Sequence, residues 1–254
     1  MREARPEAAR LELGSVLRWP TPKSKAWTTK FLESALKGDN ILAVVAVGSA
    51  VRPGVSSADL DLVVICQRSE KLTDKPPIEI DLRVYAAAEV DALIAGGNDL
   101  LGWAVKYGTP LFQRNRFWDH VLKSWRDTLP LPSVDVAFQR AEKSYRRFRE
   151  MLELHDYDAA HEQALSYATH LARAELLSKG KHPASRPELP KDLRALGNTA
   201  LADSLERLID GGAITPADLA AMLQRLRANE NRPEALATHA GRAPNGRRAN
   251  GRKR

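Results

Sequence analysis

The chain has 254 residues, of which 43% are hydrophobic, with one cysteine and a formal net charge of +7. This length can bury one large hydrophobic core or two smaller ones, whereas a single cysteine excludes an internal disulfide or a thiolate cluster. No apolar run reaches the roughly 18 residues of a membrane span and the polar start is not typical of a signal peptide, so we expect a cytoplasmic protein without membrane contact.

A helix and a buried strand are the first predicted elements. Residues 1–20 have no periodic pattern and are expected to be irregular, and a helix is predicted over 23–37. The uncharged run 41–47 is typical of a buried strand. Gly48-Ser49 directly after it predicts a turn, at which a glycine lets the backbone approach a ligand closely.

Two acidic residues open the next predicted strand. Asp59 and Asp61 flank Leu60 and precede the apolar run 62–65. Side chains alternate along a strand, so both carboxylates lie on one face. Like charges this close repel each other unless a cation lies between them. Hard oxygen ligands with few histidines or thiols nearby favour Mg²⁺, and we therefore predict a metal site.

The predicted strand over 78–84 alternates between apolar residues and the charged residues Glu79, Asp81 and Arg83. If this strand lies beside the first acidic strand, a third carboxylate joins the pair. Three carboxylates can hold two cations about 3.5–4 Å apart, as in-line phosphoryl transfer requires. Glu79 and Asp81 are both candidates for the third ligand. Arg83 either contacts phosphate or pairs with the acids.

Short helices are predicted over 88–95 and 99–107, followed by an edge strand over 109–113. Together with the preceding strands they predict a small mixed sheet. We expect helices on one face of this sheet, with the other face left for a substrate.

Helical spacing dominates from about residue 117 onward, with Thr215 as an expected N-cap. The predicted helices are 134–154, 159–177, 191–196, 199–209 and 216–228. We expect them to form a bundle that covers the open face of the sheet. The predicted fold class is α+β, with a small mixed-sheet domain over 15–115 followed by an α-helical bundle over 116–230.

The last 14 residues contain six basic residues and no acid, which leaves a net charge of +1 for the rest of the chain. This composition predicts a disordered basic tail over 231–254. Such a tail can make a weak, salt-sensitive contact with a polyanion. The net charge of +7 therefore does not indicate that the rest of the chain, outside this tail, binds nucleic acid.

The order Gly48-Ser49, a short loop, Asp59-Leu60-Asp61 and a later apolar-Asp81-apolar strand resembles the signature of polymerase-β-like nucleotidyltransferases. It is similar in particular to antibiotic adenylyltransferases and to the minimal nucleotidyltransferases of toxin–antitoxin pairs. The resemblance covers about residues 17–111 and makes 15–115 a nucleotidyltransferase domain. Arg52-Pro53-Gly54 stands where the family commonly has an Arg-Gly pair.

The resemblance implies an enzyme of the EC 2.7.7 type that uses two Mg²⁺ ions and a nucleoside triphosphate. It implies Asp59, Asp61 and Asp81 as catalytic residues and metal ligands, because the family usually has aspartate at the third position. If Asp81 is the third metal ligand, the alternative role for Glu79 is to orient or deprotonate the acceptor. Contacts with the nucleotide are implied for Gly48, Ser49, Arg52 and Ser57.

Two functions remain open at this point. The first is transfer of a nucleoside monophosphate, with AMP from ATP favoured, to an acceptor hydroxyl on a small molecule such as an aminoglycoside, on a protein, or on an RNA end. The second is a nucleotide-binding regulatory or antitoxin-like module. The presence of all three aspartates favours the enzyme, and the nearly neutral body favours a small molecule or a protein as the acceptor.

Overall fold

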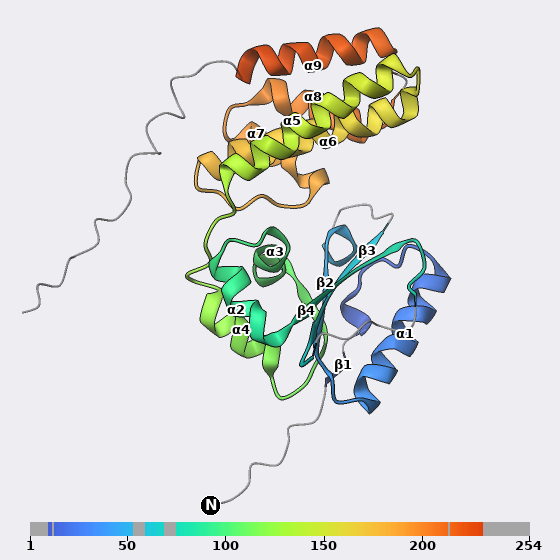
Figure 1. Cartoon of the computed structure of the whole chain (residues 1–254), viewed down its shortest axis with the longest axis vertical. Coiled ribbons are helices and arrows are strands. Elements are labelled where there is room, and N and C mark those ends of the chain that lie inside the picture. Colours follow the sequence, from blue (N-terminus) through green and yellow to red (C-terminus); the bar gives the residue numbers. More distant parts are fainter. Residues whose placement is uncertain (1–9, 12, 53–58, 69–74, 213, 231–254) are drawn as a thin grey trace, which may run out of the picture. The chain divides into compact units, whose positions relative to one another are not determined.

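The computed structural model describes residues 10–11, 13–52, 59–68, 75–212 and 214–230. Contacts divide the chain into two compact units, Met1–Gly212 and Ala213–Arg254. The predicted fold class is confirmed, because a small mixed sheet with its own helices precedes a run of further helices (Figure 1). The predicted tail over 231–254 lies outside the described residues.

Five strands form one sheet in the order β1-β5-β2-β3-β4. β2 pairs antiparallel with β3 and β5, β1 pairs antiparallel with β5, and β3 and β4 are parallel. The strands are β1 (Arg10–Leu11), β2 (Ile41–Val47), β3 (Leu60–Cys66), β4 (Ile80–Ala86) and β5 (Thr109–Gln113). The predicted edge strand is therefore an inner strand, because the two residues of β1, in a segment expected to be irregular, pair with its outer side.

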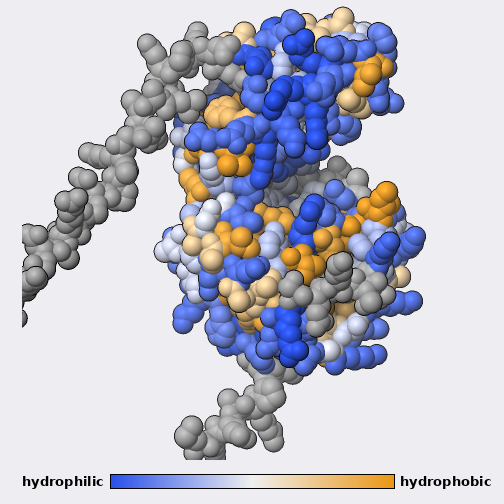
Figure 2. Space-filling model, viewed as in Figure 1, coloured by the Kyte–Doolittle hydropathy of each residue, from blue (hydrophilic) through white to orange (hydrophobic). Residues whose placement is uncertain are grey.

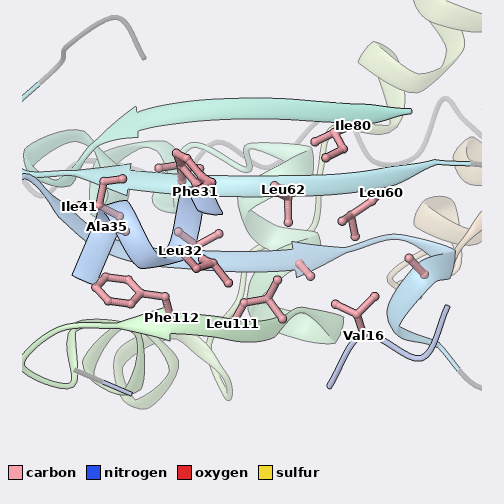
Figure 3. Packing of buried hydrophobic residues seen from close by; sticks show 14 of the residues in the cluster. Val16, Phe31, Leu32, Ala35, Ile41, Leu60, Leu62, Ile80, Leu111 and Phe112 are labelled. Atoms are coloured by element: carbon pink, nitrogen blue, oxygen red, sulfur yellow. The ribbon is translucent and has the colours of Figure 1, made fainter. Parts of the chain in front are cut away.

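Helix α1 (Pro22–Lys37) covers one face of the sheet. Its first turn is closed by a capping box between Thr21 and Ser24. Phe31 and Leu32 pack with apolar residues that β2 and β3 direct to this face, such as Val44 and Leu62, as Figure 3 shows for Phe31, Leu32 and Leu62. This cluster holds the helix against the sheet.

The opposite face is also covered by helices, so the expectation of an open substrate face is wrong. α2 (Ala87–Ala95), α3 (Asp99–Tyr107) and α4 (Phe117–Trp125) pack there. β2 is apolar at every position, so Ala43 and Val45 enter this second cluster together with the fully buried Trp118. A strand without polar positions requires cover on both faces, and the helical bundle therefore does not lie on a bare sheet.

The strand predicted over 78–84 begins two residues later than expected. The Ile80 amide donates to the Pro77 carbonyl at 3.0 Å, which closes a turn before β4 begins. Ile78 is 98% exposed in this turn, and Glu79 precedes the strand instead of lying within it. The paired prolines before the turn cannot donate to a sheet, and this delays the strand.

Helices α5 (Val134–Glu153) and α6 (Tyr157–Ser178) form an antiparallel pair. Buried Ala137 packs with Ala174, and the hydroxyls of Ser144 and Ser166 lie 3.0 Å apart. Helices η3 (Arg186–Glu188), α7 (Leu189–Ala195) and α8 (Thr199–Ile209) follow. The surface over α5 is mainly hydrophilic in the view of Figure 2, which accords with the amphipathic pattern of its sequence.

The second unit contains α9 (Pro216–Glu230). The Asp218 amide donates to the Thr215 hydroxyl at 3.2 Å, so the predicted N-cap is confirmed. None of the helices in the described part of the chain combines the length and apolar character needed to cross a bilayer.

We expect Leu32→Ala to lower the free energy of unfolding by about 2–5 kcal/mol, because it leaves a void between α1 and the sheet. Leu32 is fully buried, whereas Leu36 on the same helix is 42% exposed. Leu36→Ala is therefore the matched control, with an expected loss of about 1 kcal/mol or less. Urea unfolding of both variants measures the difference, and equal losses would contradict this packing.

Candidate functional site

Three strands bring their polar ends together at one rim of the sheet. β2 ends at Val47, and β3 and β4 begin at Leu60 and Ile80. The register aligns Val47 with Asp61, and Asp61 with Asp81. Neighbouring strands lie about 4.8 Å apart, so Asp61 and Asp81 are direct neighbours at this rim. The sheet thus brings together two of the three predicted aspartates.

The turn after β2 lies directly against the Asp61 carboxylate. Gly48 has φ +84°, which side chains rarely adopt, and a Cβ built on it would lie 2.5 Å from Asp61 Oδ2. Both the backbone conformation and the close carboxylate therefore require glycine at this position. Ser49 begins the short helix η2 (Ser49–Val51) immediately after the turn and lines the same cavity as Asp61.

Asp61 carries a strongly perturbed carboxyl group. Burial, followed by the charges of Asp59 and Asp81, raises its pKa from 3.8 to about 6. The charges of Arg83 and Arg173 lower this pKa, but they do not cancel the effects of burial and of the two neighbouring acids. A divalent cation would offset the charges of these acids, and carboxylate oxygens are the ligands that Mg²⁺ prefers.

The other two aspartates are more exposed than Asp61. Asp59 lines the cavity beside Asp61, whereas Asp81 is bound to Arg83 on its own strand at 2.9 Å. Two roles were considered for Arg83, and this contact corresponds to the second, in which Arg83 pairs with the acids. Among the described residues, no group of three or more histidine, cysteine, aspartate or glutamate side chains is placed to hold a metal ion. Binding of a metal ion through all three aspartates would thus require their side chains to move.

Glu79 occupies a different position from Asp81. It lies in the turn before β4, and its carbonyl accepts a hydrogen bond from the Leu60 amide at 2.8 Å. Its Oε2 atom is buried without a hydrogen-bond partner among the described residues. The residue in register with Asp61 is Asp81, so the strand pairing favours Asp81 over Glu79 as the third carboxylate.

A cavity of about 460 Å³ opens at this rim. Its sheet side contains Gly48, Ser49, Asp59 and Asp61. The helices and the connector between α6 and η3 supply its other lining residues, among them Asp99, Trp103, Arg140, His170, Arg173 and Arg186. The cavity therefore has acids on the sheet side and mainly basic groups on the helix side.

Of the two remaining predicted nucleotide contacts, Arg52 is described by the structure and does not line the cavity. Arg52 donates two hydrogen bonds to the Glu188 carboxylate and stacks on the ring of Tyr107, with Cζ 4.6 Å from the ring centroid. Its guanidinium is thus held at the connector before α7. Ser57 lies outside the described residues.

The basic residues of the cavity were not identified from the sequence. Arg140, Arg173 and Arg186 come from three different elements, and no local motif links them. One signal was present, because Arg173 lies in a predicted helix between the apolar pairs Leu171-Ala172 and Leu176-Leu177, with Glu175 as the one other charged residue of that segment. An arginine on the buried side of a helix indicates a specific environment.

No protein-family model matches the chain, and no curated protein does. Among solved structures, the chain is similar to a nucleotidyltransferase-like protein from Exiguobacterium sibiricum, with 19% identity and a TM-score of 0.39. The match covers 81% of this chain and 73% of that protein. The similarity concerns the fold alone.

We predict that Asp61→Asn stabilises the metal-free protein at pH 7.5 by about 1–3 kcal/mol. The pKa of about 6 means that the folded protein binds this proton more tightly than the unfolded chain, whose value is 3.8. Ionising Asp61 therefore lowers stability as the pH rises from about 4 to 6. Urea unfolding in the presence of a chelator at pH 4 and pH 7.5 measures the effect.

The control for this measurement is Asp39→Asn, which changes an exposed carboxylate before β2, at the far end of that strand from Gly48. It should alter stability by about 0.5 kcal/mol or less at both pH values. A gain for Asp61→Asn that is equal at pH 4 and pH 7.5 would exclude the proposed ionisation.

Gly48→Ala should lower the free energy of unfolding by more than Gly180→Ala does. Both glycines have positive φ, +84° and +71°, but only Gly48 has a carboxylate within reach of an added methyl group. Strain from φ alone costs about 1–3 kcal/mol, and the Gly48 variant must also displace Asp61. Thermal unfolding of the two variants compares them, and equal midpoints would rule out the close approach.

Proposed function

We propose that this protein is a magnesium-dependent nucleotidyltransferase. It would move a nucleoside monophosphate, with AMP from ATP favoured, to a hydroxyl of a small molecule or a protein. The observation that supports this best is the row formed by Gly48, Asp61 and Asp81 across three strand ends, with Asp59 beside it. Acids and a glycine turn beside one cavity suit phosphoryl transfer.

Asp59, Asp61 and Asp81 would hold the metal ions. When bound, Mg²⁺ lowers the pKa of an attacking hydroxyl and offsets charge on the leaving pyrophosphate. With a pKa of about 6, Asp61 is mostly ionised at pH 7.5 and available as a ligand. Asp59 is exposed and lines the same cavity as Asp61, so it would contribute a further oxygen.

Gly48 and Ser49 would bind the phosphates. Because Gly48 has no side chain, a phosphate could approach the backbone next to the Asp61 carboxylate. Ser49 lines the cavity, and its hydroxyl would donate to a phosphate oxygen. A volume of about 460 Å³ falls within the range of roughly 300–1,000 Å³ of small-ligand sites.

We predict that Asp61→Asn and Asp59→Asn each lower the rate of nucleotidyl transfer by about 10³-fold or more. Each substitution removes a charged metal ligand that acts in the transition state. The assay contains purified protein, Mg²⁺, each α-labelled nucleoside triphosphate in turn, and cell extract as the source of acceptors. The readouts are labelled product and released pyrophosphate.

The matched control is again Asp39→Asn, which should retain full transfer because Asp39 is an exposed residue outside the cavity lining. Circular dichroism establishes that each variant is folded. Transfer by folded Asp61→Asn at the wild-type rate would contradict the proposal. Nucleotide binding by the wild type without any product would instead favour the regulatory or antitoxin-like module.

A further inference from the structure

Three guanidinium groups and one imidazole gather at the cavity wall opposite the sheet. Arg140 belongs to α5, His170 and Arg173 belong to α6, and Arg186 belongs to η3. None of these residues is used by the proposed transfer reaction. Their convergence from three elements separated in sequence indicates a tertiary site rather than a solvated helix face.

These groups oppose each other electrostatically. Burial, and then the charge of Arg186, lowers the pKa of Arg173. Burial and the charges of Arg173, Arg140 and Arg186 lower the pKa of His170 to about 4. His170 is therefore neutral at pH 7, and the three arginines carry the charge. Like charges gathered beside a cavity are unfavourable unless an anion offsets them.

The protein itself offsets only part of this charge. Arg140 is ion-paired with Asp99. Arg173 and Arg186 make no hydrogen bond or ion pair with any of the described residues. Two of the three guanidinium groups thus remain available to a ligand.

The position of Arg186 is stabilised by its neighbours. Glu188, two residues later, accepts hydrogen bonds from Arg52 and from the amide and hydroxyl of Ser185. The preceding connector is held by Trp103, whose indole donates to the Pro183 carbonyl at 3.1 Å. These contacts fix the backbone on both sides of Arg186, which reduces the conformational entropy that this segment loses when a ligand binds.

We propose that Arg173 and Arg186, with Arg140 beside them, bind an anionic group of the acceptor, a phosphate or a carboxylate. This inference rests on the proposed nucleotidyltransferase function. Gly48, Ser49 and the aspartates on the sheet side would occupy the triphosphate, whereas the arginines line the cavity from the helix side. In-line transfer requires the acceptor and the leaving pyrophosphate on opposite sides of the reacting phosphorus, so a second anion subsite suits the acceptor.

The same charges disfavour a polycationic acceptor such as an aminoglycoside. Apart from Asp59 and Asp61, the only acid among the described lining residues is Asp99, and Arg140 already occupies it. Several ammonium groups would thus meet guanidinium groups instead of carboxylates. The expected acceptor therefore combines a hydroxyl with an anionic group.

Inorganic phosphate is the probe for this subsite. It is titrated into the full-length protein by calorimetry and by thermal shift, at constant ionic strength with chloride. One series contains the protein alone, and a second contains protein saturated with Mg²⁺ and an α,β-methylene nucleoside triphosphate, which occupies the triphosphate site without reacting. We expect phosphate binding in both series, with dissociation constants within about 3-fold of each other.

Arg173→Gln and Arg186→Gln should each weaken phosphate binding by about 10-fold or more, since a charged hydrogen bond is lost. Binding of the methylene nucleotide should change by less than about 3-fold. Arg149→Gln is the matched control, because Arg149 is an exposed arginine of α5 outside the cavity lining and should leave both affinities unchanged. Arg186 is exposed, so its replacement tests the site even if Arg173→Gln fails to fold.

The outcomes separate this inference from the proposed function. If the methylene nucleotide displaces phosphate, the arginines bind the triphosphate and not the acceptor. That result would overturn this inference and leave the proposed function standing. Absence of phosphate binding, or binding unchanged in both variants, would also overturn it. If no nucleoside triphosphate binds, the proposed function fails, and the acceptor assignment fails with it.

Ligand-free stability gives an independent readout. Replacing a partly buried, unpaired guanidinium should raise the thermal midpoint of Arg173→Gln above that of the wild type, although the variant loses phosphate binding. If Arg173 had a purely structural role, its replacement would lower the thermal midpoint instead. A lowered midpoint together with unchanged phosphate binding would therefore contradict a ligand-binding role.

Discussion

The close approach between the Asp61 carboxylate and the Gly48 backbone is the constraint on which the candidate site depends. Strand pairing places Val47 opposite Asp61, and the chain then turns at Gly48 with a positive φ. Because sheet hydrogen bonds set this register, the position of Asp61 beside the glycine turn is fixed by the core of the sheet. A side chain at Gly48 would force the two apart, and with them the turn and the acid that the proposed chemistry requires.

Charge separation across the cavity follows from this arrangement. Asp59 and Asp61 face it from the sheet, while Arg140, Arg173 and Arg186 face it from the helices and the connector. Burial is the main cause of the raised pKa of Asp61 and of the lowered pKa of Arg173, and like charges nearby add to both shifts. Low accessibility to water strengthens such effects. A cation at the acids and an anion at the arginines would each offset the repulsion between like charges on that side.

Most elements of the fold were predictable because their patterns are local. The apolar run of β2, the helical spacing of α5 and α6, and the Thr215 cap are each set within a few turns of chain. The predictions that proved wrong concern residues whose partners lie far away in the sequence. β1 becomes a strand only by pairing with β5, and the cover on the second sheet face depends on how α2, α3 and α4 pack. No local pattern contains that information.

The sequence by itself determined the α+β class, the glycine turn and the aspartates, since residue type and alternation along a strand specify these locally. Only the tertiary structure decided that Asp81 rather than Glu79 is in register with Asp61, because two prolines and a turn delay the start of β4. It also brought Arg140, Arg173 and Arg186 to one cavity. Contacts between residues far apart in the chain depend on packing free energy summed over the whole core, which a single segment does not encode.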